Sequence, residues 1–74
     1  MNVHVKLFAS LRNFGPERQA LELPAGATIG DVVRALEIPE SVRLLRIVNG
    51  EHRPESEPLR DGDVLALFPP IAGG

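Results

Sequence analysis

The sequence predicts a single α+β domain in which a mixed sheet of four to five strands curls around one main helix. Three observations lead to this fold class. The chain has 74 residues, which is enough for only one domain. Apolar and polar residues alternate near its start, and a continuous apolar run lies near its end. Between them lies one segment with helical spacing of its apolar residues and a capping signal at its start.

Two strands are predicted before the helix. Residues 3–7 alternate apolar and polar side chains, which is typical of a half-buried strand. The next segment contains a Gly-Pro breaker pair, and Leu11 and Phe14 lie three residues apart in it. We therefore expect a helical turn over the edge of the core, followed by a second short strand over residues 20–23.

The helix is predicted to begin after Thr28. Thr28 and Asp31 have the spacing of a capping box, in which each side chain accepts a hydrogen bond from the other residue's backbone N–H. The charge of Asp31 also lies near the positive end of the helix dipole. Pro39 cannot continue a helix, so we expect about ten helical residues. The apolar stripe consists of Ile29, Val32, Val33 and Leu36.

The remaining strands follow the helix. A third strand is predicted over residues 43–48 and ends at Asn49-Gly50, a pair that suits a turn with positive φ at both central residues. Residues 51–53 are expected to pair back briefly. The last strand spans residues 63–68 and is apolar on both sides, as in strands that are covered on both faces.

One helix can cover only one face of such a sheet, so the last strand must expose apolar side chains. Either Leu65 and Leu67 face the helix while Val64, Ala66 and Phe68 face outward, or the reverse holds. Both arrangements leave an uncovered apolar strip, and contiguous strips of this kind mark surfaces that bind partners. The alternative is a small, scattered strip without a partner.

Acidic residues are concentrated between residues 51 and 63, where five acidic and two basic side chains occur. A solvated loop is the first interpretation of this segment. A contact with a basic partner is the second.

Composition and charge exclude several classes of protein. The formal net charge is −2, so there is no basic excess for binding nucleic acid. The longest apolar run has five residues, whereas roughly 20 are needed to span a bilayer. The first residues also lack the layout of a signal peptide. We therefore expect a cytoplasmic protein with neither a nucleic-acid nor a membrane partner.

The chain also lacks the side chains for catalysis or metal binding. It has no cysteine and two histidines. His4 falls in the first strand and His52 follows the Asn-Gly turn, so both are expected to be surface strand residues. No third metal ligand and no nucleophile lies at a suitable spacing. We expect no enzyme with its own pocket, no metal site and no bound cofactor.

The chain is expected to divide into a folded domain, residues 1–68, and an extended flexible tail, residues 69–74. Pro69 and Pro70 have no N–H to donate, so strand pairing is expected to stop at Phe68. The two prolines also stiffen the base of the tail.

The rest of the tail is predicted to enter another protein. Ile71 is an isolated apolar residue, and Gly73 and Gly74 have no Cβ, so their backbone fits a narrow channel. Six extended residues reach about 20 Å. An ordinary frayed terminus is the alternative. Because no thiol is present, the Gly74 carboxylate is the best candidate for carrying an activated group.

The tail and three other segments resemble the small subunit of molybdopterin synthase, the MoaD type of ubiquitin-like sulfur carrier in the MoaD/ThiS family. These segments are residues 7–12, 48–49, 61–63 and 67–74. The similarity extends over nearly the whole chain. A Gly-Gly end alone is shared with other ubiquitin-like proteins, whereas the form Phe-Pro-Pro-x-x-Gly-Gly is more specific.

The resemblance implies a β-grasp (ubiquitin-like) fold and the chemistry of a carrier. An adenylating enzyme of the MoeB/ThiF type would use ATP to convert the Gly74 carboxylate into an acyl adenylate, and a sulfur donor would then form a thiocarboxylate. The tail would enter a large subunit of the MoaE type, where the sulfur would pass to a pterin precursor for molybdenum (or tungsten) cofactor biosynthesis. The chain would thus be a non-catalytic subunit. Its partner-binding residues would be Phe68, Pro69, Pro70, Ile71, Ala72 and Gly73.

Three alternatives to this role remain. A ThiS-type carrier would supply sulfur for the thiazole of thiamin or for another product, but such carriers tend to have a tighter connection between the first two strands. A protein modifier would form an isopeptide bond between Gly74 and lysines of its targets. A passive interaction module of the same fold would not need the Gly-Gly end.

Overall fold

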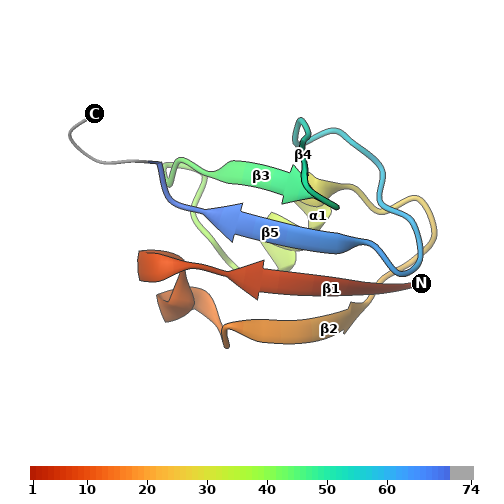
Figure 1. Cartoon of the computed structure of the whole chain (residues 1–74), viewed down its shortest axis with the longest axis horizontal. Coiled ribbons are helices and arrows are strands. Elements are labelled where there is room, and N and C mark those ends of the chain that lie inside the picture. The colour runs from red at the N-terminus through yellow and green to blue at the C-terminus, as the bar shows by residue number, and fades with distance from the viewer. Residues whose placement is uncertain (71–74) are drawn as a thin grey trace.

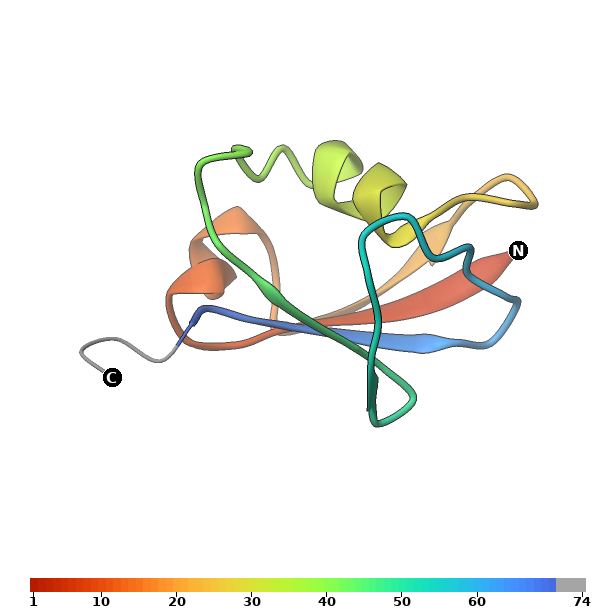
Figure 2. The same cartoon turned by 90° about the horizontal axis from the view of Figure 1, so that it is seen from above.

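The computed structural model describes residues 1–70, and its elements follow the predicted order. They are β1 (Asn2–Leu7), the 3₁₀ helix η1 (Ala9–Phe14), β2 (Arg18–Glu22), α1 (Ile29–Ala35), β3 (Leu45–Val48), β4 (Glu51–His52) and β5 (Val64–Phe68). Within these residues the strands form one sheet in the order β2-β1-β5-β3-β4 (Figure 1). Figure 2 shows α1 and η1 on the same side of that sheet. The predicted α+β fold, with a mixed sheet around one main helix, is confirmed.

The first and last strands lie side by side in the middle of the sheet. β1 and β5 are parallel, with Val5 opposite Leu65 and Leu7 opposite Leu67. β2 pairs antiparallel with β1 on one side, and β3 pairs antiparallel with β5 on the other. β1 and β5 are therefore hydrogen-bonded along both edges.

The core lies between α1 and the sheet. Its completely buried side chains include those of Val3, Val5, Leu7, Ile29, Val32, Leu65 and Leu67. Burial of each such side chain contributes about 1.5–3 kcal/mol. Leu11 of η1 is also buried, so the predicted helical turn does cover the edge of the core. The face of the sheet that contacts α1 is thus the part that stabilises the fold.

The predicted capping box is present at the start of α1. The Asp31 N–H donates to Thr28 Oγ1 over 3.2 Å, and the Thr28 N–H donates to Asp31 Oδ2 over 2.8 Å. Arg34 donates a further hydrogen bond to Asp31. The hydrogen bonds from the Thr28 backbone and from Arg34 lower the pKa of the Asp31 carboxyl, because they stabilise its charged form.

The helix is shorter than predicted: it has seven residues and ends four residues before Pro39. Glu37 has a φ of +59°, and its N–H donates to the Arg34 carbonyl over 2.9 Å. The Ile38 N–H donates to the Val33 carbonyl over 3.2 Å. This is a Schellman motif. It turns Ile38 into the core, where 4% of the residue is exposed, so burial of Ile38 ends the helix before the proline can.

Two strand boundaries differ from the prediction by two residues, and the others by one residue at most. β2 begins at Arg18, two residues earlier, because pairing with β1 continues as far as Lys6. β3 begins at Leu45, two residues later. The side chains of Val42 and Leu44 in the preceding segment pack against the core instead.

The turn between β3 and β4 has the predicted conformation. Asn49 and Gly50 have φ values of +50° and +86°, which only glycine and a few polar residues adopt readily. The Asn49 side chain also accepts a hydrogen bond from the Val64 N–H over 3.0 Å. This bond ties the turn to the beginning of β5.

Two acidic residues of the segment from residue 51 to 63 have structural roles. Asp61 accepts a hydrogen bond from the Asn2 N–H over 2.7 Å. Asp63 accepts one from the Arg60 N–H over 2.8 Å and another from the Asn49 side chain over 2.9 Å. These bonds support the interpretation of the segment as a solvated loop whose carboxylates stabilise its turns.

Candidate functional site

The predicted tail begins where β5 leaves the sheet. Phe68 is the last residue of β5 and is half-buried, as is Pro69, whereas Pro70 is exposed. The remaining predicted site residues, Ile71, Ala72, Gly73 and Gly74, lie outside the described residues. The described part of the candidate site is therefore the surface around Phe68.

Phe68 is stacked on Phe8 at this end of the sheet. The two ring centroids are 4.3 Å apart and the ring planes are inclined by 8°. The Phe8 N–H donates to the Leu67 carbonyl over 3.1 Å, which holds Phe8 beside the end of β5. Sequence reasoning did not identify Phe8 as a site residue. Phe8 lies two residues after Lys6 in the alternation of the first strand, and this position was the signal by which it could have been identified.

The structure decides between the two predicted orientations of β5. Leu65 and Leu67 have no exposed surface and face α1. Val64, Ala66 and Phe68 alternate with them, so they point to the other face and are half-buried. The predicted strip therefore lies on the face that is turned away from the helix, where it is partly and not fully exposed.

Two residues of β3 extend this strip. Residues directly opposite each other in an antiparallel pair share a face of the sheet. Leu45 lies opposite Phe68 and Ile47 lies opposite Ala66. Leu45 is 37% exposed. We call these five residues the outer strip: Leu45, Ile47, Val64, Ala66 and Phe68.

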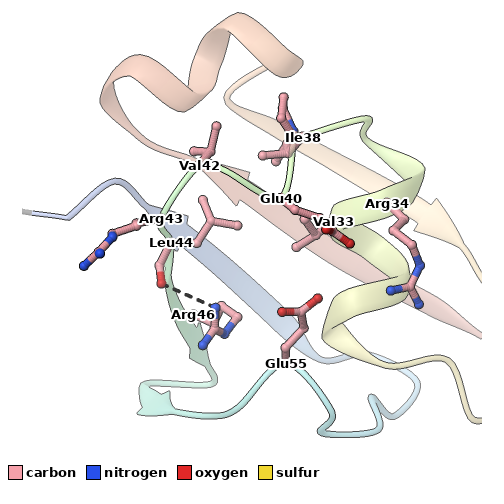
Figure 3. Close-up of a pocket in the computed structure, with 10 residues that line it drawn as sticks. Val33, Arg34, Ile38, Glu40, Val42, Arg43, Leu44, Arg46 and Glu55 are labelled. Atoms are coloured by element: carbon pink, nitrogen blue, oxygen red, sulfur yellow. Dashed lines mark hydrogen bonds between the residues drawn. The ribbon is translucent and has the colours of Figure 1, made fainter.

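The helix side of the sheet contains a hollow of about 490 Å³ next to the end of α1 (Figure 3). Arg46 reaches it because Arg46 lies opposite Leu67 and so faces the helix. The Arg46 Nε is buried and has no hydrogen-bond partner within the described residues. Figure 3 shows Glu55 pointing into the hollow and Arg43 pointing away from it. The lining has neither cysteine nor histidine, so it offers no nucleophile paired with a base.

The two histidines are far apart on exposed strand positions, as predicted. His4 lies on β1 and His52 on β4, with β5 and β3 between them. Neighbouring strands are spaced by about 4.8 Å, so about 14 Å separate the two positions. Among residues 1–70, no group of three His, Cys, Asp or Glu side chains could hold a metal ion.

In the part of the chain that the structure describes, neither helix is long and apolar enough to cross a membrane.

Comparison with known proteins agrees with this geometry. Residues 5–74 match the model of the ThiS family. Small archaeal modifier protein 1 of Haloferax volcanii is 34% identical to the chain, with 93% of this chain and 97% of the relative covered. Small archaeal modifier protein 3 of the same archaeon is 29% identical, with both chains covered completely.

A solved structure shows the same fold. A Pyrococcus furiosus protein provisionally assigned as molybdopterin converting factor, subunit 1, is 32% identical and superposes with a TM-score of 0.82. The match covers 95% of this chain and 98% of that protein. The fold is therefore the ubiquitin-like β-grasp, and the chain belongs to the ThiS family of small ubiquitin-like proteins, which includes the MoaD-type carriers that it resembles.

Proposed function

We propose that the chain is a sulfur carrier protein that acts as the small subunit of a molybdopterin synthase. In this role the Gly74 carboxylate is adenylated, converted to a thiocarboxylate and used to deliver sulfur to a pterin precursor. The observation on which the proposal rests most is the family match, which extends over residues 5–74 and so includes the Gly-Gly end. The likeness to the Pyrococcus furiosus protein supports the molybdopterin branch.

The outer strip supports a role that depends on a partner. It starts at Phe68, the residue from which the tail continues, and it extends across β5 and β3. A partner that covers the outer strip would therefore hold the start of the tail at its own surface. In this proposal the acid–base groups of the reaction belong to the partners.

The chemistry requires two steps at the same carboxyl group, the first at its oxygen and the second at its carbon. A carboxylate is a poor electrophile, so an adenylating enzyme of the MoeB/ThiF type first joins it to AMP from ATP and releases pyrophosphate. A sulfur nucleophile then displaces AMP and leaves a thiocarboxylate. The proposal needs no cofactor bound to this chain, and it places the protein in the cytoplasm, where ATP is available.

Intact-mass analysis tests the carrier role. The full chain is incubated with the adenylating enzyme of its own organism, ATP and a sulfide source. We expect a species in which one oxygen is replaced by sulfur. The matched control lacks Gly73 and Gly74; it should fold normally, because neither glycine has a side chain to add to the core, and it should remain unmodified. Finding only the unmodified mass for the full chain would contradict the proposal.

A second assay tests the molybdopterin branch. The thiocarboxylated chain is mixed with the large synthase subunit and the pterin precursor. We expect the sulfur to leave the carrier and the dithiolene product to form. A carrier that keeps its sulfur in this mixture but releases it to a thiazole-forming enzyme would instead be a thiamin carrier.

The second candidate function is that of a protein modifier joined to lysines through Gly74. Both curated relatives described above are named as modifier proteins, and one of them is 34% identical. Denaturing gels of cell extract that contains a tagged chain distinguish the two roles. Bands that survive denaturation and contain the tag with other proteins would favour the modifier, and their absence would favour the carrier.

A further inference from the structure

Two positively charged side chains lie directly opposite each other on the outer face of the sheet. Lys6 of β1 pairs with Arg18 of β2, and neither forms an ion pair within residues 1–70. Side chains in this position have Cβ atoms about 5 Å apart, and like charges there destabilise the sheet. The folded chain by itself therefore gives no reason for this arrangement.

Acidic side chains are too far away to compensate the two charges. Glu22 shares the outer face of β2 but lies opposite Asn2, four residues from Arg18. Four residues of a strand span about 13 Å. Glu17 is adjacent to Arg18 in the chain, but it lies 3.7 Å from Arg12 and pairs with that residue.

The two charges are continuous with the outer strip. Lys6 lies opposite Ala66 on its other side, and Ala66 in turn lies opposite Ile47. Arg18, Lys6, Ala66 and Ile47 thus form one row across β2, β1, β5 and β3. The row has two cations at one end and apolar side chains in its middle, and His52 of β4 lies beyond them opposite Ile47.

We propose that Lys6, Arg18 and the outer strip are one docking surface for a partner protein with a carboxylate next to apolar side chains. This inference rests on the docking role of the outer strip given above. A carboxylate near Lys6 and Arg18 would accept hydrogen bonds from both and remove their mutual repulsion, while apolar side chains cover Ala66 and Ile47. A neutral or basic surface would leave the repulsion in place, so the pair selects an acidic partner.

The test uses changes whose effects on folding and on binding have opposite signs. In Lys6→Glu a carboxylate faces Arg18, so the melting temperature of the isolated chain should stay the same or rise. The affinity for the adenylating enzyme of the same organism should fall about tenfold, and this affinity should depend less on salt concentration than that of the wild type. Arg18→Glu should behave in the same way. Arg60→Glu is the matched control, because it makes the same charge change at an exposed residue in the turn before β5.

Each outcome decides the question. If Lys6→Glu and Arg18→Glu bind as the wild type does, or no more weakly than Arg60→Glu, the acidic-partner inference is wrong. If Phe68→Glu weakens binding in the same experiment, the docking role of the outer strip still stands. If Phe68→Glu also binds normally, the docking role of the outer strip is wrong too. Sedimentation of the chain alone is the last check. Salt-sensitive dimers that are lost in Lys6→Glu would assign this face to a second copy and overturn the inference.

Discussion

The two faces of the sheet are built from the same strands, yet they differ in what covers them. The inner face contacts α1 and includes side chains with no exposed surface, such as Leu65 and Leu67. The outer face has neighbouring residues of the same strand, Ala66 and Phe68, and these are half-buried. Within β5 the apolar character is therefore similar on both faces, but only the inner face is a completed core.

The difference shows that the apolar content of a strand does not identify its role. In a chain of 74 residues, one seven-residue helix can cover only part of one face. The apolar side chains on the other face are only half-buried by folding, so part of their surface is available to a partner. We therefore expect changes on the inner face to affect stability and changes on the outer face to affect binding.

The largest expected effect is on the stability of the inner face. Leu67→Ala should lower the free energy of unfolding by about 3 kcal/mol, because it leaves a cavity in the core, where Leu67 has no exposed surface. Phe68→Ala, one residue along, should cost about 1 kcal/mol, since its ring is half-exposed and loses mainly the stacking on Phe8. Urea denaturation of both variants measures the difference. Equal losses would mean that the two faces are not distinct in stability.

The next effect concerns binding at the outer face. Phe68→Glu should weaken binding to the adenylating enzyme or the large subunit by about 2 kcal/mol, because it places a charge in the apolar contact where the tail begins. Its melting temperature should fall by less than that of Leu67→Ala. Titration calorimetry and thermal unfolding give the two values. A large loss of stability with normal affinity would assign Phe68 to the core.

A smaller effect is expected where α1 begins. Thr28→Ala removes the hydroxyl that caps the helix and should cost about 1 kcal/mol of stability. Ser56→Ala, at an exposed position of the acidic segment, is the matched control and should change little. Both variants should bind partners normally, because neither residue is on the outer face. Weaker binding by Thr28→Ala would show that the helix end influences that face.

The smallest effect is the pH dependence of the same cap. The folded state lowers the pKa of Asp31 below its ordinary value of 3.8, so the carboxylate contributes stability above that pH. The contribution is lost as the pH falls through the lower, folded-state pKa. Wild type should therefore exceed Asp31→Asn in unfolding free energy at neutral pH, and the gap should close in acid. A gap that is constant between neutral and strongly acidic pH would contradict this role of the charge.

Much of the fold could be predicted because its signals are local. The alternation in residues 3–7, the Thr28–Asp31 capping box and the Asn49-Gly50 turn each depend on neighbouring residues, and all three are present. The end of α1 could not be predicted in this way. It depends on the burial of Ile38, which involves contacts with distant parts of the chain.

The candidate site was predictable in part. Phe68 and the two prolines follow directly from the sequence, whereas Phe8 joins the site through a stack between segments 60 residues apart. The predicted roles of Ile71, Ala72, Gly73 and Gly74 stay predictions, because those residues lie outside the described part of the chain.

The sequence alone determined the order of strands and helix, the capped helix start, the turn after β3 and the Gly-Gly end, because each depends on a few adjacent residues. Only the tertiary structure decided which side of β5 faces α1. A run such as residues 64–68 is apolar in both directions, so the choice depends on pairing with β1 and β3. The pairing of β1 with β2 likewise brought Lys6 opposite Arg18, because strand register is a relation between segments and is not encoded in either one alone.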